Sequence, residues 1–233
     1  MRGCRRRKRS HSTIAVKLRI GTPRCLLVIA PHPDDETIGA YALITRMRRR
    51  GVKVRILVVT DGGASHTASP TWPRHRLIRE RQQETFRAVR QLGIFRGAVT
   101  FLGLPDGRLV QETRSANRLI AGAIRHAPKP LLVVAPACSD DHPDHRVVAT
   151  AVGGARQARV RRLAYSVWPA GAAIRHAGAV TLSAQERLAK RHAIRSYRTQ
   201  AGRIRDDPNG FAMTRAQIAA FSRAVETFVE RAE

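Results

Sequence analysis

Two short segments of this sequence concentrate side chains that can bind a metal ion and move protons. They are PHPDDE at residues 31–36 and HPDH at residues 142–145. So many carboxylates in one cleft would repel one another without a cation, and neutral imidazoles and carboxylates are ligands that a divalent metal prefers. Two histidines and one aspartate would leave a tetrahedral zinc ion with an open position for water, which is a catalytic rather than a structural arrangement. The two segments therefore predict a metal-dependent hydrolase.

Neighbouring residues within each segment are suited to different tasks. The prolines of both segments fix φ and so limit the freedom that the other side chains lose on binding a ligand. Asp34 and Asp35 are adjacent and should point in different directions, so that one can bind the metal while the other acts as a general base on water. His142 and His145 are three residues apart at a predicted helix start. They share a face of that helix, so one can bind the metal while the other faces the substrate.

Five apolar runs predict the strands that position these segments, at 25–30, 54–60, 98–102, 130–135 and 162–167. The most continuous runs are typical of strands buried on both faces. Amphipathic stretches predict helices between the strands, one that ends at Gly51 and others near 75–92, 112–126 and 143–157. This alternation predicts a mostly parallel sheet with helices on both faces. Ligands bind beyond the carboxyl ends of such strands, which is where both segments fall.

Two helices are predicted near the end of the chain. Ser183 with Glu186, and Thr214 with Gln217, both have the spacing of a capping box, which satisfies free N–H groups at the start of a helix. In the second of these helices, four apolar residues have helical spacing and predict a stripe that packs against the body of the domain: Ile218, Phe221, Val225 and Phe228.

Further stretches accompany the two segments, namely TDGG at 60–63 with the following His66, RQQE at 81–84, FLGLPDG at 101–107 and RSYRTQ at 195–200. With them the sequence resembles the PIG-L or LmbE-like family of zinc-dependent N-deacetylases, which remove acetyl groups from N-acetylglucosamine-containing substrates. The resemblance extends over about residues 23–230. It implies a Rossmann-like α/β fold, a three-layer sandwich with two C-terminal helices. We therefore expect one deacetylase domain at 23–233, preceded by a flexible basic arm at 1–22.

The resemblance also implies which residues hold the metal. His32, Asp35 and His145 match the zinc ligands of the family, and Asp34 matches the base that takes a proton from the water. The expected cofactor is Zn²⁺, although the same ligands accept Fe²⁺ or another divalent metal.

Four other residues match positions of the family that act on the substrate. His142, held by Asp144, would stabilise the oxyanion of the intermediate or protonate the leaving amine, a proton that Asp34 could supply instead. Arg81 and Asp106 would lie against the sugar. One departure concerns the stretch before HPDH, because some relatives carry a tyrosine there that contacts the intermediate. Here the stretch 138–141 reads CSDD, so oxyanion stabilisation is expected to depend more on zinc and His142.

The formal net charge of +26 suggests affinity for nucleic acid. However, all but five of the 43 basic residues are arginines, and they are spread over the whole sequence. This distribution indicates a compositional bias, and we expect no specific nucleic-acid partner. The milder inference is a preference for an anionic amino-sugar conjugate or surface.

Other features concern the compartment. The three cysteines are widely spaced without a CxxC pair, which fits a reducing environment. The basic start is followed by a stretch too polar for an export signal, and no apolar run approaches the roughly 20 residues that cross a bilayer. We expect a soluble cytoplasmic protein without a transmembrane segment.

Three functions remain open at this point. The leading one is hydrolysis of an N-acetyl group on an N-acetylglucosamine-containing conjugate. A second is hydrolysis of another amide or acyl conjugate or of a phosphoester, although many phosphoesterases use two metals about 3.5–4 Å apart and the two segments supply ligands for one. The third is a non-catalytic basic protein that binds nucleic acid or a surface.

Overall fold

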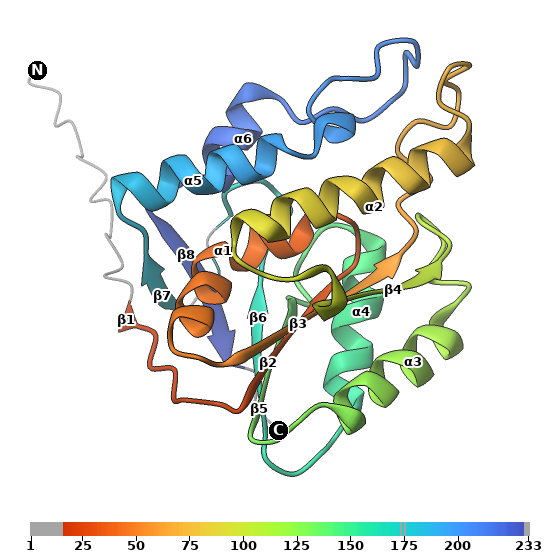
Figure 1. The fold of residues 1–233 in the computed structure, drawn as a ribbon. Coiled ribbons are helices and arrows are strands. Elements are labelled where there is room, and N and C mark those ends of the chain that lie inside the picture. The colour runs from red at the N-terminus through yellow and green to blue at the C-terminus, as the bar shows by residue number, and fades with distance from the viewer. Residues whose placement is uncertain (1–15, 173, 175, 231–233) are drawn as a thin grey trace, which may run out of the picture.

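The computed structural model describes residues 16–172, 174 and 176–230 (Figure 1). Within this part of the chain, eight strands form one sheet in the order β1-β7-β8-β6-β5-β2-β3-β4. The strands are β1 Val16–Lys17, β2 Cys25–Ala30, β3 Lys53–Thr60, β4 Val99–Leu104, β5 Leu131–Pro136, β6 Val160–Tyr165, β7 Gly178–Thr181 and β8 Val225–Glu230. The helices are α1 Asp35–Arg49, α2 Arg74–Gln91, α3 Thr113–His126, α4 Pro143–Gly154, α5 Ala184–Arg195 and α6 Arg215–Phe221, with 3₁₀ turns η1 Arg96–Ala98 and η2 Arg198–Gln200.

The mostly parallel sheet predicted from the apolar runs is confirmed. Strands β4, β3, β2, β5 and β6 are parallel to one another, and β8 runs antiparallel to both β6 and β7. All five predicted strands are present, with ends that differ by at most two residues from the expected ones. Both C-terminal helices begin at the predicted capping boxes, on Ser183 and Thr214.

Helices cover both faces of the sheet (Figure 1). Helices α1, α2, α5 and α6 lie on one face, and α3 and α4 on the other. Successive residues of β2 alternate between two apolar cores, with Leu26 and Val28 in the first and Leu27 and Ile29 in the second. Because successive side chains of a strand point to opposite faces, a strand covered on both sides needs the continuous apolar run that the sequence shows.

The end of the chain differs from the prediction. Helix α6 ends at Phe221, and Val225–Glu230 is a strand, so the expected helical stripe through Val225 and Phe228 is wrong. In β8 the buried side chains are Glu226 and Phe228, two residues apart as in a strand. Backbone pairing with β7 and β6 determines this segment, and no local pattern of period 3.6 reveals that pairing.

The predicted basic arm lies mostly outside the described residues, which begin at residue 16. Within the part that is described, Val16 and Lys17 form the short strand β1 beside β7. No helix of the described residues is long and apolar enough to cross a membrane.

Helix α1 is interrupted at Ala40, four residues after the PHPDDE segment. Ala40 has a non-helical backbone (φ −137°, ψ 17°), which marks a kink in the helix. At this kink Lys190 Nζ donates to the Ile38 carbonyl at 2.7 Å, and the Ala42 N–H donates to the Glu226 carboxylate at 3.0 Å. Lys190 and Glu226 also pair with each other at 2.8 Å, both buried. A buried ion pair thus supplies hydrogen-bond partners to the helix backbone on both sides of the kink.

Candidate active site

The two polar segments meet at the carboxyl edge of the sheet. PHPDDE connects β2 to α1, and HPDH begins α4 a few residues after β5. Strands β2 and β5 are parallel neighbours, with Val28 beside Val134. Their carboxyl ends therefore lie together, although the segments are more than a hundred residues apart in sequence.

Three predicted metal ligands form a compact group. His32 Nδ1, Asp35 Oδ2 and His145 Nε2 are each 3.2 Å from the other two, and all three residues are buried. Ligands about 2.0–2.1 Å from one tetrahedral metal are about 3.3–3.4 Å apart. The spacing and the chemistry of these donors fit a single divalent cation.

A carboxylate lies beside the second ring nitrogen of each imidazole, the one that faces away from the proposed metal position. His32 Nε2 lies 3.1 Å from Asp106 Oδ1 and 3.3 Å from Asp144 Oδ2, and His145 Nδ1 lies 3.1 Å from Asp140 Oδ1. A carboxylate holds the imidazole proton on the nitrogen that it faces, which leaves the other nitrogen free to bind a metal. Two further sets have ligand atoms within 4.8 Å of one another, His32 with His142 and His145, and His32 with Asp106 and Asp144.

The charges of the group also fit a cation. Burial lowers the pKa of His145, but Asp35 and Asp140 outweigh it and raise that pKa to about 9. Burial likewise opposes protonation of His32, yet hydrogen bonds with Asp106, Asp144 and Asp35 raise its pKa well above the usual value. The pKa of Asp35 falls well below its usual range because the two histidines outweigh its burial. In the metal-free protein these imidazoles therefore hold protons that a bound cation would displace.

Asp34 is held in a strained backbone conformation beside the group. Its φ of 140° is rare for any residue but glycine, and such strain is often found at functional sites. Its carboxylate lies 3.5 Å from Arg81 Nη2 and lines a cavity. Burial raises the pKa of Asp34 well above its ordinary value, with a further contribution from Asp35, although Arg81 opposes the shift. A carboxyl group with a raised pKa is suited to accept a proton near neutral pH.

Arg81, predicted to contact the sugar, is only 3% exposed. Its guanidinium donates to the carbonyls of Gly62 and Pro33 at 2.9 Å each and lies 3.7 Å from Asp106 Oδ2. The side chain thus connects the β2–α1 loop to the TDGG stretch and lies behind Asp34. Both Arg81 and Asp106 line the cavity.

His142 caps the start of α4. Its Nδ1 accepts a hydrogen bond from the Asp144 N–H at 3.2 Å, so a neutral ring carries its proton on Nε2. Burial lowers the pKa of His142, and the neighbouring His32 and His145 lower it further. The carboxylate of Asp144 does not hold His142 as expected. It contacts His32 and accepts from the N–H groups of Gly107 and Leu109 at 2.8 and 3.1 Å.

One residue of the site was not singled out from the sequence. Asp140 is 1% exposed, and it faces His145 while accepting from the N–H groups of Val167 and Trp168 at 2.8 and 3.0 Å. Its neighbour Asp141 is exposed. Two adjacent aspartates before HPDH gave no sequence signal of which one faces inward.

Two other motifs of the sequence, RQQE and RSYRTQ, form hydrogen bonds that support the site. The Tyr197 hydroxyl donates to Glu36, the last residue of PHPDDE. Glu84 of RQQE accepts from Thr199 through both its N–H and its hydroxyl, at 2.9 and 2.6 Å. The stretch RSYRTQ therefore connects α1 and α2 and does not supply metal ligands.

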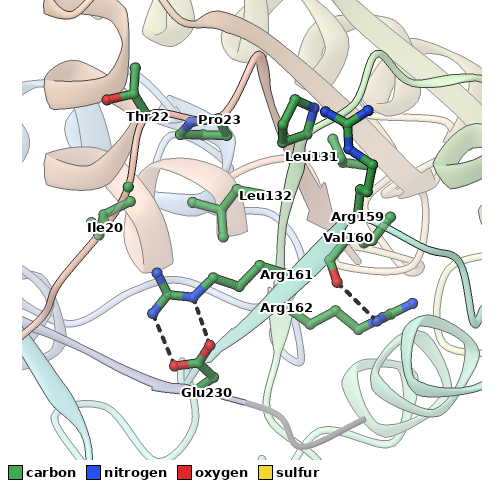
Figure 2. Close-up of a pocket in the computed structure, with 12 residues that line it drawn as sticks. Ile20, Thr22, Pro23, Leu131, Leu132, Arg159, Val160, Arg161, Arg162 and Glu230 are labelled. Carbon is green, nitrogen blue, oxygen red and sulfur yellow. Dashed lines mark hydrogen bonds and ion pairs between the residues drawn. The ribbon is translucent and has the colours of Figure 1, made fainter.

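The cavity at this edge has a volume of about 660 Å³. Its lining includes charged and titratable side chains, apolar side chains and the polar residues Ser65, Gln200 and Asn209. The charged and titratable ones are His32, Asp34, Asp35, Arg81, Asp106, Asp141 and His142. A second cavity of about 630 Å³ lies at the opposite edge, where β5 and β6 begin (Figure 2). There Arg161 pairs with Glu230 and Arg162 donates to the Val160 carbonyl, and its described lining contains no histidine or aspartate.

The part of the chain that holds both segments matches a family model. Residues 27–155 match PIG-L, described as GlcNAc-PI de-N-acetylase. The diacetylchitobiose deacetylase of Thermococcus kodakarensis is 32% identical over 124 residues, which are 52% of this chain and 45% of that protein. The probable N-acetyl-alpha-D-glucosaminyl L-malate deacetylase 2 of Bacillus subtilis is 29% identical over 191 residues, which are 78% of this chain and 86% of that protein.

A third relative is the 1D-myo-inositol 2-acetamido-2-deoxy-alpha-D-glucopyranoside deacetylase of Mycobacterium avium, 29% identical over 53% of this chain and 48% of its own length. The chain thus spans about half the length of two of these relatives. Among solved structures, N,N'-diacetylchitobiose deacetylase from Pyrococcus horikoshii has the same fold, with a TM-score of 0.69 and 21% identity over 90% of this chain and 84% of that chain.

Proposed function

Since this chain belongs to the PIG-L family of GlcNAc-PI de-N-acetylases, we propose that it hydrolyses the N-acetyl group of an N-acetylglucosamine-containing conjugate. The observation that carries the proposal is the group of His32 Nδ1, Asp35 Oδ2 and His145 Nε2, spaced for one metal ion. The three relatives are named as deacetylases of amino-sugar conjugates. Zinc is the metal that we propose, with Fe²⁺ as the alternative.

Hydrolysis of an amide needs a nucleophile, stabilisation of an oxyanion and a proton for the leaving amine. A divalent cation held by His32, Asp35 and His145 supplies Lewis acidity and lowers the pKa of water. Asp34 accepts a proton from the attacking water, since its carboxylate lines the cavity and has a raised pKa. Arg81 holds Asp34 in place from behind.

His142 is the proposed hydrogen-bond or proton donor in the reaction. With Nδ1 occupied by the Asp144 N–H, its Nε2–H is the group that can donate to the oxyanion or to the nitrogen that leaves. The C–N bond of the amide breaks, and the products are acetate and the free amine of the sugar. Asp106 is the proposed contact for the sugar because it lines the cavity. Its Oδ2 accepts from the Ala64 N–H at 3.0 Å, and its Oδ1 lies 3.1 Å from His32 Nε2.

Other expectations from the sequence remain predictions. The arginine-rich composition favours an anionic conjugate, and the cytoplasm is the expected compartment. A specific nucleic-acid partner is not expected.

Acetate release tests the proposal. The protein is depleted of metal with a chelator, reloaded with Zn²⁺ or Fe²⁺, and assayed on N-acetylglucosamine conjugates with inositol, malate or a second sugar. We expect metal-dependent acetate release from at least one conjugate. Release of phosphate from phosphoesters without acetate, in a protein that binds two metals, would instead support the phosphoesterase alternative.

A further inference from the structure

Part of the cavity is lined by apolar side chains that the proposed chemistry does not use. Ile38, Val167 and Met213 are buried, whereas Trp168 and Phe211 are half-buried. Trp168 and Phe211 pack against the core that includes the first three, so this wall is a part of the core that reaches the cavity. We call these five residues the apolar wall.

The aromatic rings of the apolar wall are held in fixed positions. Trp168 packs edge-to-face on Phe221 at 5.4 Å and on Phe211 at 5.9 Å between ring centroids. Such contacts are favourable beyond the area that they bury. The Phe211 N–H donates to the Ser65 carbonyl at 2.9 Å, which ties its loop to the stretch after TDGG. The wall is therefore formed before a ligand binds, and ordering it costs little.

The apolar wall is also adjacent to the reaction centre. The Trp168 N–H donates to Asp140, the residue that faces His145, at 3.0 Å. The Trp168 carbonyl accepts from the Asp141 N–H at 3.3 Å, next to His142. A substrate positioned at the proposed metal site would therefore have this surface beside it.

The charge of the described cavity lining contrasts with that of the whole chain. The formal net charge of the chain is +26, yet the only arginine or lysine among the lining residues is Arg81, which already faces Asp34 and Asp106. Asp141 adds a further carboxylate to the lining. An anionic substituent would meet no free cationic side chain there, whereas an apolar one would remove exposed apolar surface from water.

We propose that the apolar wall is a subsite for an alkyl or aryl substituent of the substrate. The proposal rests on the proposed function and specifies its substrate class as an amino-sugar conjugate with an apolar group. That group belongs either to the N-acyl chain or to the aglycone. Any negative charge on the substrate lies outside the cavity.

Calorimetric measurement of ligand binding to the metal-loaded protein distinguishes the N-acyl chain from the aglycone as the source of the apolar group. One pair of ligands is methyl and hexyl N-acetyl-glucosaminide, and the other is methyl N-acetyl- and methyl N-hexanoyl-glucosaminide. Burial of a few methylene groups against the apolar wall predicts that the hexyl or hexanoyl ligand of one pair binds at least tenfold more tightly than its partner. The pair that shows the difference identifies the aglycone or the acyl chain as the occupant.

Two variants test whether the apolar wall causes the tighter binding of the hexyl or hexanoyl ligand. In Phe211→Ala the ratio of the two dissociation constants should fall below about threefold, and in Trp168→Phe it should fall in part. The matched control is Phe95→Ala, because Phe95 is 87% exposed and is absent from the cavity lining. This control should keep the wild-type ratio.

Equal dissociation constants in both pairs, or an unchanged ratio in Phe211→Ala, would overturn the subsite. Tighter binding of a carboxylate-bearing conjugate than of both apolar ligands would overturn it as well. Acetate release is measured on the same N-acetyl ligands. Release without an apolar preference would refute the subsite and leave the deacetylase, and an apolar preference without release would refute the deacetylase and leave the subsite.

Discussion

Asp140→Asn tests whether the carboxylate behind His145 sets the metal affinity. Asp140 Oδ1 lies 3.1 Å from His145 Nδ1 and accepts from the His142 N–H at 3.1 Å, and Oδ2 accepts from two more N–H groups. Every neighbour thus offers a proton, so the NH₂ of asparagine faces a donor in either orientation. Loss of such a partner typically lowers metal affinity about 10–100-fold, which is about 1.4–2.8 kcal/mol.

The assay is competition for Zn²⁺ against a chromophoric chelator at fixed pH. The matched control is Asp141→Asn, which removes the same charge from the adjacent, exposed position and should change the affinity less than about threefold because exposed charges are screened. Thermal unfolding of the metal-free proteins reports separately on the cost of the mismatched amide, about 1–3 kcal/mol. Equal zinc affinity in the two variants would refute the role that we assign to Asp140.

Three other predictions follow from the same contacts. Asp34→Asn should keep metal affinity within about threefold but lose about 10²–10⁴ of turnover, as expected for a general base; turnover close to wild type in an acetate assay would remove Asp34 from that role. Lys190→Met leaves the buried Glu226 without its cationic partner and should cost about 3–5 kcal/mol, a fall in Tm of roughly 6–20 °C for a chain of this size. Adding Glu226→Gln should recover part of that loss, and a Tm within 2 °C or so of wild type in the single variant would contradict the account. Metal affinity should rise with pH up to about 9, because the raised pKa of His145 keeps its ring protonated below that value and the cation must displace the proton; a chelator competition that gives the same affinity at pH 7 and pH 9 would count against it.

The central part of the fold could be predicted because its pattern is local. Strands buried on both faces need uninterrupted apolar runs, and 25–30 and 130–135 supply them. The two strands are parallel neighbours, so the segments that follow them lie together at one edge of the sheet.

The remainder depends on contacts between distant parts of the chain. Val225 and Phe228 continue the helical spacing of Ile218 and Phe221, so the sequence predicts a helix where strand β8 lies. The pairing of β8 with β6 and β7, which determines the strand, joins distant parts of the chain. The Lys190–Glu226 ion pair likewise joins residues of different elements, and no local sequence pattern predicts it.

The same limit applied within the site. Residue types and spacing indicated which side chains could act, and the family resemblance assigned their roles. Which carboxylate holds which imidazole depends on geometry: the carboxylate of Asp144 contacts His32, and Asp140 faces His145.

Anomalous diffraction from crystals of the zinc-loaded protein, measured above and below the zinc edge, tests the central claim most directly. We predict one strong peak within about 2.0–2.2 Å of His32 Nδ1, Asp35 Oδ2 and His145 Nε2. The peak should be absent from Asp35→Ala crystals grown in the same zinc solution. No peak at this group, or a peak held only by His32 Nε2, Asp106 and Asp144, would contradict the metal site and the hydrolytic mechanism built on it.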